Sequence, residues 1–378
     1  MNEYYMQQAL TIAQYATGRT SPNPLVGAVI VKDGHIVGQG WHRQAGTPHA
    51  EIHALAQAGE LARGATIYVT LEPCSHYGRT GPCADALIKA GVKKVVVAMT
   101  DPNPEVAGNG LARLRTAGIE VVEGILAAEA ARINEVFLKW ITTGMPFAIL
   151  KTAMSLDGKI AAYTGHSQWI TCSDAREYVH KLRNIYDGIL VGVGTILADN
   201  PKLTTRLPEG SHNPVRIIVD SMARTPLAAN VVTDKQAPTI VAVGQEAPPE
   251  RVEALRNLGV EVLVLEQTPR GVNLRQLFKA LGERRITSVF VEGGATINAS
   301  LFADNLIDKV YCFVAPKILG GKAAPSPVGG IGVERVDQAI LMEDIMTQSI
   351  GTDILISGYI TGREGRDVYR ACGGIGEN

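Results

Sequence analysis

Apolar and polar residues alternate along the first part of the chain in short blocks that predict helices and strands in turn. Residues 3–17 carry apolar side chains at mixed helical spacing and predict an opening helix. Apolar runs at 25–31 and 36–40 flank Asp33-Gly34, a dipeptide typical of a tight turn, and predict a β-hairpin. The following blocks predict helices at 49–58 and 83–90 and strands at 66–71, 94–99 and 119–123.

A break in this pattern divides the chain. An amphipathic stretch at 126–140 closes the first region, and residues 142–146, with Gly and Pro, interrupt both periodicities. Alternation then resumes, with predicted strands at 147–151, 188–193, 215–219, 239–243, 261–265, 288–292 and 309–314. We therefore expect two α/β domains, at 1–144 and 146–362, and a Gly-rich, charged tail at 363–378.

Charge and composition exclude several classes of protein. The 378 residues include 36 Lys and Arg against 37 Asp and Glu, so no overall positive field is available for a nucleic acid. The N-terminus has no basic leader, and no apolar run approaches the roughly 20 residues of a membrane span. Five cysteines are too few for a disulfide framework and predict reduced thiols. We expect a cytoplasmic enzyme with a small-molecule substrate and no nucleic-acid or membrane partner.

The strongest chemical signal is a set of metal-ligating residues. His49 is followed by Glu51, and Cys74 and Cys83 come later, each beside a proline. One imidazole nitrogen and two thiolates leave the fourth position of a tetrahedral zinc ion open to water, as catalytic zinc requires. Glu51, which is not a ligand, is then the candidate that takes the proton of the water and passes it to a leaving amine. We predict one zinc ion per chain.

The prolines indicate how these side chains meet. Residues two apart in the middle of a helix point to nearly opposite sides, so His49 and Glu51 share a site only in a first helical turn. Pro48 and Pro82 are both suited to the first helical position, which predicts helix starts aimed at the metal. The alternative is that Cys74 and Cys83 are ordinary buried thiols. Eight residues separate them, and His76 in that interval is a competing ligand.

These segments resemble a known family. His-x-Glu followed by Pro-Cys and a further Cys is the signature of zinc nucleobase deaminases, although about two residues usually separate the cysteines. The segments around His49, from Leu71 to Cys83 and at Asp101-Pro-Asn-Pro are similar to the bifunctional deaminase/reductase family of riboflavin biosynthesis. The resemblance implies hydrolytic deamination of 2,5-diamino-6-ribosylamino-4(3H)-pyrimidinone 5′-phosphate. It also implies a substrate contact at Asn23, which by itself also reads as a turn former between prolines.

The second half lacks the glycine fingerprint of a Rossmann domain, since Gly192-Val-Gly194 is not continued. Its segments 150–159, 192–199 and Glu292-Gly-Gly294 resemble the reductase half of the same family, a relative of dihydrofolate reductase. The implied fold class is α/β, with a cytidine-deaminase-like three-layer domain followed by a dihydrofolate-reductase-like domain. Glycines after buried strands let backbone amides approach a pyrophosphate, although such turns also occur without a ligand.

The resemblance further implies an NADPH-dependent reduction of the ribosyl group to ribityl. Lys151, which we expect at the end of the domain's first strand, is the candidate that polarises or protonates the sugar. The implied substrate contacts are Ser167, Arg183, Leu203, Arg206 and Glu292, and guanidinium groups suit a sugar phosphate. The implied NADPH contacts are Ala153, Trp169, Thr195, Asp199, Ser221, Gly294, Ala295 and Thr296.

Two rival functions stay open at this point. A tRNA or single-strand nucleobase deaminase shares the zinc chemistry but requires a basic channel, which the net charge of -1 does not suggest. The C-terminal half is alternatively a non-catalytic nucleotide sensor. The sequence does not distinguish a monomer from a homodimer or a higher homo-oligomer.

Overall fold

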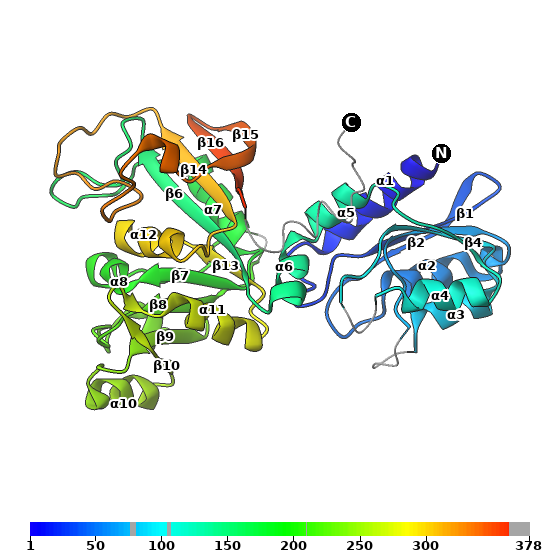
Figure 1. Ribbon diagram of the computed structural model, residues 1–378, viewed down its shortest axis with the longest axis horizontal. Helices are drawn as coiled ribbons and strands as arrows, with labels where there is room; N and C mark the ends of the chain where they lie inside the picture. The colour runs from blue at the N-terminus through cyan, green and yellow to red at the C-terminus, as the bar shows by residue number, and fades with distance from the viewer. Residues whose placement is uncertain (76–80, 104–106, 209, 363–378) are drawn as a thin grey trace. The chain divides into compact units, whose positions relative to one another are not determined.

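The computed structural model describes residues 1–75, 81–103, 107–208 and 210–362 (Figure 1). The chain divides into two compact units with the division between Gly144 and Met145, and each unit is described by itself. Both His76 and the tail at 363–378, which the sequence analysis singled out, lie outside the described residues. No helix within the described ranges has the length and apolar character that a membrane span requires.

A five-stranded sheet forms the centre of the N-terminal unit. Its strands lie in the order β2-β1-β3-β4-β5. The predicted hairpin is present, and β1 also pairs with β3 in antiparallel fashion, whereas β3, β4 and β5 are parallel. The strands are β1 (Gly27–Lys32), β2 (His35–Trp41), β3 (Thr66–Leu71), β4 (Lys94–Met99) and β5 (Glu120–Val122).

Helices cover both faces of this sheet because successive strand residues point to opposite sides. On β1, Ala28 and Ile30 belong to the cluster formed with α2, α3 and α4, whereas Val29 and Val31 belong to the cluster formed with α1, α5 and α6. The unit is therefore a three-layer α/β/α domain. Its helices are α1 (Asn2–Ala13), α2 (Ala50–Ala58), α3 (Cys83–Ala90), α4 (Asn109–Thr116), α5 (Ala127–Ile133) and α6 (Glu135–Thr143).

The helical regions differ from the prediction in three places. The first α-helix ends at Ala13 and continues only as a 3-10 turn to Ala16. The stretch at 126–140 is two helices that meet at Asn134, because the Asn134 side chain accepts from the Leu25 N–H (2.7 Å) and donates to its carbonyl oxygen (3.0 Å). Helix α4 was not predicted; the helix has only eight residues, and Asn109, Arg113, Arg115 and Thr116 among them are polar.

A nine-stranded sheet in the order β10-β9-β8-β7-β13-β6-β14-β16-β15 forms the centre of the C-terminal unit. All its strands run in one direction except β16, which pairs in antiparallel fashion with both β14 and β15. The strands are β6 (Phe147–Ser155), β7 (Gly188–Gly192), β8 (Val215–Val219), β9 (Thr239–Gly244), β10 (Glu261–Leu265), β13 (Ser288–Val291), β14 (Lys309–Ala315), β15 (Met342–Ile350) and β16 (Asp353–Ile360).

Helices again lie on both faces. Residues of α11 and α12 pack in one apolar cluster, and residues of α8, α9 and α10 pack in another. A two-stranded ribbon of β11 (Gln267–Thr268) and β12 (Gly271–Val272) precedes α11. The helices are α7 (Ser173–Arg183), α8 (Val193–Asp199), α9 (Asn230–Thr233), α10 (Pro249–Asn257), α11 (Leu274–Glu283) and α12 (Ala295–Ala303).

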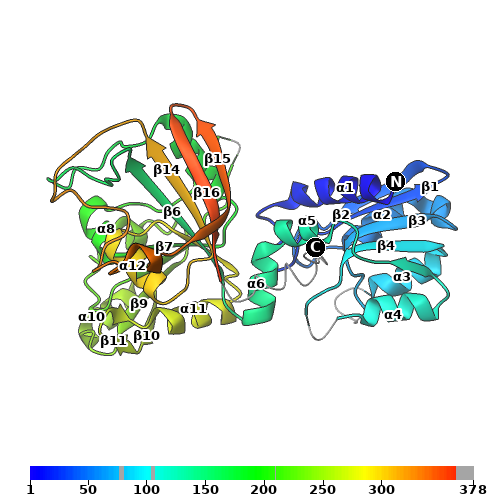
Figure 2. The ribbon, with the colours of Figure 1, turned by 45° about the horizontal axis from the view of Figure 1, so that its top comes forward.

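The structure corrects two expectations for this unit. The hairpin of β15 and β16, visible beside β14 in Figure 2, was not predicted, because β15 is mostly exposed and carries no apolar alternation. The first strand extends to Ser155, so Lys151 lies in the middle of β6 and not at its end.

Candidate active sites

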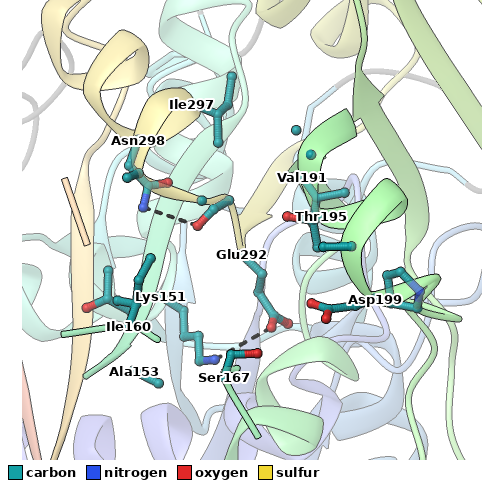
Figure 3. A pocket seen from close by; sticks show the side chains of 18 of the residues that line it. Lys151, Ala153, Ile160, Ser167, Val191, Thr195, Asp199, Glu292, Ile297 and Asn298 are labelled. Carbon is teal, nitrogen blue, oxygen red and sulfur yellow. Dashed lines mark hydrogen bonds and ion pairs between the residues drawn. The ribbon is translucent and has the colours of Figure 1, made fainter. Parts of the chain in front are cut away.

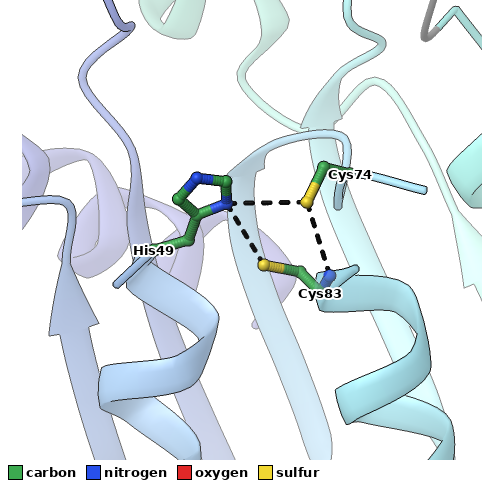
Figure 4. A group of neighbouring side chains, drawn as sticks. All are labelled: His49, Cys74 and Cys83. Carbon is green, nitrogen blue, oxygen red and sulfur yellow. Dashed lines mark hydrogen bonds between the residues drawn. The ribbon is translucent and has the colours of Figure 1, made fainter. Parts of the chain in front are cut away.

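The predicted metal ligands converge in the N-terminal unit (Figure 4). The Nδ1 atom of His49 lies 3.5 Å from the Cys74 Sγ and 3.3 Å from the Cys83 Sγ. The three ligand atoms all lie within 4.8 Å of one another. Zinc bonds of about 2.0 Å to nitrogen and 2.3 Å to sulfur at tetrahedral angles place such atoms about 3.5 Å apart. The donor set therefore fits a zinc ion.

Two helix starts position these residues. His49 is the N-cap of α2, Glu51 is the second residue of that helix, and Cys83 is the first residue of α3. The predicted placement of His49 and Glu51 in one first turn is confirmed. The predicted helix starts are present, but neither proline takes the first helical position: Pro48 precedes the N-cap of α2, and Pro82 is itself the N-cap of α3.

The hydrogen bond between Cys74 and Cys83 shifts the pKa values of the two thiols in opposite directions. The hydrogen bond with Cys83 lowers the pKa of Cys74 to about 4, with a further contribution from His49, while Cys74 and burial raise the pKa of Cys83. The backbone N–H of Cys83 also donates to the Cys74 Sγ at 3.4 Å. The lowered pKa of Cys74 favours its thiolate, the form that ligates a metal.

Glu51 is a buried carboxyl group beside the ligands and has an exposed fraction of 3%. Burial raises its pKa to about 7, and the nearby His49 opposes that rise. Its side chain also shares a hydrogen bond with the Cys83 thiol. An acid with a pKa near the working pH both accepts and returns a proton readily.

Asn23 reaches this site through a residue that the sequence analysis missed. The Asn23 Nδ2 lies 3.1 Å from the Nε2 of His42, whose ring packs edge-on against His49 with 5.4 Å between centroids. The backbone N–H of Asn23 also donates to the Thr20 carbonyl (2.8 Å), so Asn23 is a turn residue as well. His42 lies just past the end of β2, and no spacing in the sequence marks it.

A second missed residue, Glu72, anchors the loop that precedes Cys74. Its carboxylate accepts hydrogen bonds from four backbone N–H groups of another loop and the start of α4, at 2.8 to 3.3 Å. A side chain at Gly110 would lie only 2.0 Å from the Pro73 carbonyl oxygen, so the two segments are in direct contact. The donors belong to Asp101, Gly108, Gly110 and Leu111.

A pocket of about 920 Å³ opens at the carboxyl ends of the parallel strands in the C-terminal unit (Figure 3). Such strand ends are where open α/β sheets bind ligands. Every residue that the resemblance implied for this domain lines the pocket: Lys151, Ala153, Ser167, Trp169, Arg183, Thr195, Asp199, Leu203, Arg206, Ser221, Glu292, Gly294, Ala295 and Thr296.

Opposite charges meet at Glu292, whose side chain is 12% exposed. One of its carboxylate oxygens accepts from the Arg183 Nε at 2.5 Å, and the other lies 3.6 Å from the Lys151 Nζ. Burial by itself would raise the pKa of Glu292, but Arg183 and Lys151 outweigh it and lower that pKa to about 2. The carboxylate therefore stays ionised and holds both cations in the pocket.

Glycines open one side of this pocket to a ligand. A Cβ atom built on Gly194 or Gly294 would meet nothing within 4 Å. Gly294 is the N-cap of the nine-residue helix α12 and supplies no side-chain cap. The first amides of α12 thus remain available to an anionic group, and these residues fit the phosphates of a dinucleotide.

Comparisons with known proteins cover nearly the whole chain. Residues 146–356 match the family model of the RibD C-terminal domain, and residues 1–99 match that of the cytidine and deoxycytidylate deaminase zinc-binding region. The riboflavin biosynthesis protein RibD of Bacillus amyloliquefaciens is 45% identical over 371 residues, which are 98% of this chain and 100% of that protein.

Solved structures agree with this result. The structure of Acinetobacter baumannii RibD has a TM-score of 0.86 at 42% identity, covering 95% of this chain and 99% of that one. A Thermotoga maritima protein, described as a diaminohydroxyphosphoribosylaminopyrimidine deaminase/5-amino-6-(5-phosphoribosylamino)uracil reductase, has a TM-score of 0.83 at 38% identity. That match covers 95% of this chain and 98% of the Thermotoga chain.

These matches confirm the predicted fold class, the zinc-binding deaminase domain and the reductase domain with NADPH as its cofactor. They favour the bifunctional enzyme over a nucleobase deaminase with a non-catalytic second domain, because the reductase model covers 146–356. The chain belongs to the RibD family of riboflavin biosynthesis proteins.

Proposed function

We propose that this chain catalyses two steps on a pyrimidine ribosyl phosphate. The N-terminal unit removes an amino group from 2,5-diamino-6-ribosylamino-4(3H)-pyrimidinone 5′-phosphate by hydrolysis. The C-terminal unit reduces the ribosyl group of the product, 5-amino-6-(5-phosphoribosylamino)uracil, to ribityl. The convergence of His49, Cys74 and Cys83 beside the buried Glu51 is the observation that carries the proposal.

In the deaminase site, His49, Cys74 and Cys83 hold zinc, which when bound lowers the pKa of a water molecule to about 7. Glu51 removes a proton from the attacking water and delivers it to the departing amine, so that water is consumed and ammonia leaves. Asn23 binds the pyrimidine, and His42 orients the Asn23 amide through the 3.1 Å contact.

In the reductase site, NADPH when bound would supply the hydride that C1′ of the ring-opened ribosylamino group receives. Lys151 would donate the balancing proton to the nitrogen bonded to C1′, because hydride addition to the C1′=N bond leaves the electron pair on that nitrogen. Arg183 binds one carboxylate oxygen of Glu292. The other oxygen of Glu292 positions the Lys151 ammonium group. Ser167, Leu203 and Arg206 contact the substrate, and the cofactor lies against Ala153, Trp169, Thr195, Asp199, Ser221 and residues 294–296.

We also place both activities in the cytoplasm, because Cys74 and Cys83 are free thiols and that compartment keeps thiols reduced. A homo-oligomer is proposed from the edge strand β15, which ends the nine-stranded sheet. It exposes Ile345 and Met346, at 51% and 53%, where a second chain can pair. Light scattering that finds a monomer at micromolar concentration would reject the homo-oligomer.

The test of the two activities is a coupled assay on the diaminopyrimidine ribosyl phosphate. Ammonia release reports the first step, and NADPH oxidation reports the second. We expect both signals from the wild-type chain, and NADPH oxidation alone when the deaminated substrate is supplied. Ammonia release without NADPH oxidation on either substrate would reject the reductase half of the proposal.

A further inference from the structure

A histidine with no role in the proposed mechanism lies beside the two arginines of the reductase pocket. His180 belongs to α7, one turn before Arg183, and lines the same pocket as Arg206. The backbone N–H of Arg206 donates to the Nδ1 of His180 at 3.3 Å. A neutral imidazole that accepts at Nδ1 carries its proton on Nε2. Among the residues that the structure describes, Nε2 has no hydrogen-bond partner.

Burial and the neighbouring cations favour the neutral form of this ring. Burial lowers the pKa of His180 to about 4, and Arg183 and Arg206 add to that effect, while Glu292 opposes it. Lys151, Arg183 and Arg206 are cations that act on the ring, and the carboxylate of Glu292 also acts on it. An excess of positive charge among these four groups favours an anionic ligand such as a phosphate monoester.

Arg183, Arg206 and His180 differ in which of their hydrogen-bond donors are already bound within the protein. Arg183 is already committed, since it donates from Nε to Glu292 and from a terminal nitrogen to the Thr204 carbonyl oxygen at 3.0 Å. The backbone N–H of Arg206 donates to His180, and among the described residues the Arg206 guanidinium group has no hydrogen-bond or ion-pair partner, so it can bind an anion. A phosphate between Arg206 and His180 would receive a charged donor from one and a neutral donor from the other.

We propose that His180 is a substrate-binding residue that donates from Nε2 to the 5′-phosphate of the reductase substrate, while its Nδ1 holds the Arg206 backbone in place. This inference relies on the proposed reductase function, because that function supplies the phosphate. It adds a second, uncharged phosphate donor to the site and explains why a histidine is kept unprotonated among three cations.

Two substitutions separate the two nitrogen atoms. In His180→Asn the amide oxygen takes the place of Nδ1 and still accepts from Arg206, but the Nε2 donor is lost. In His180→Gln the amide nitrogen takes the place of Nε2 and donates to the phosphate, but the contact with Arg206 is lost. The KM for the deaminated substrate, with and without its 5′-phosphate, is measured for both variants at saturating NADPH.

We expect His180→Asn to raise the KM for the phosphorylated substrate about tenfold, as removal of one hydrogen bond to a charged group predicts. The same variant leaves the KM for the dephosphorylated substrate unchanged, and His180→Gln recovers most of the loss. An unchanged melting temperature of the C-terminal unit shows that each variant is folded.

Three outcomes would overturn the assignment. A wild-type KM in His180→Asn would mean that Nε2 touches no substrate group. An equal rise for both substrates would place Nε2 against the sugar or the ring. A loss in His180→Gln alone would leave only the structural contact with Arg206. If the wild-type chain itself oxidises no NADPH with the phosphorylated substrate, the proposed reductase function fails instead.

Discussion

Arg183 and Glu292 lie 109 residues apart in the sequence, and their side chains meet with 2.5 Å between Nε and Oε1. The pair joins the last residue of α7 to the residue that follows β13. Because Glu292 also attracts Lys151, one carboxylate holds the two cations of the reductase site. Substitution at this position therefore affects both stability and reduction.

Glu292→Gln is expected to destabilise the C-terminal unit by about 3 kcal/mol, the cost of leaving a partly buried cation without its partner. Reduction should fall at least tenfold because Lys151 loses its anchor, while deamination is retained. Thermal unfolding and the two separate assays measure these effects. Glu283→Gln, which removes the same charge from an exposed position on α11, is the matched control. A variant with wild-type stability and reduction would contradict the role given to Glu292.

Acidification should weaken the C-terminal unit in two steps. His180 has a folded pKa of about 4, below its ordinary 6.5, so its unfolded form binds a proton first and stability falls from pH 6.5 to 4. Glu292 has a folded pKa of about 2, below its ordinary 4.5, so its contribution is full above pH 4.5 and is lost toward pH 2. Hydrogen exchange of peptides covering β13 measures both steps. His180→Asn should remove the first step and Glu292→Gln the second.

Cys74→Ser should abolish both bound zinc and deamination, because a serine hydroxyl is a poor substitute for a thiolate ligand. Metal analysis is expected to find about one zinc per wild-type chain and almost none in the variant. Cys312→Ser makes the same change in the reductase unit and should keep the metal. Full zinc content in Cys74→Ser would show that another residue completes the site.

Glu51→Gln should retain the zinc but slow ammonia release by about 10² to 10⁴ times, the usual contribution of a positioned general acid and base. The amide is similar in size to the carboxyl group and cannot carry the proton. Steady-state ammonia release and metal content are measured together, with the exposed Glu60→Gln as control. Normal turnover in Glu51→Gln would exclude this residue as the proton carrier.

Lys151→Ala should lower NADPH oxidation by about 10² times and leave ammonia release unchanged, because the lysine lies only in the reductase pocket. Single-turnover reduction at saturating NADPH separates the chemical step from cofactor binding. Lys279→Ala, an exposed lysine on α11, is the control. If Lys151→Ala reduces the substrate at the wild-type rate, another group supplies the proton.

The two-domain organisation, the zinc ligands and the central strands of both sheets could be predicted from the amino-acid sequence alone. These features are local. Buried strands are continuous apolar runs, and His49 and Glu51 share a site because both lie in one helical turn. A resemblance over short motifs was enough to identify the residues that line the reductase pocket.

Contacts between residues far apart in the chain could not be predicted and became evident only in the folded structure. His42 against Asn23, Glu72 beneath the start of α4, Glu292 between Lys151 and Arg183, and the exposed strand β15 carry no periodic signal. Each depends on which strands become neighbours, and that is set by the packing of whole sheets and not by the local order of apolar and polar residues.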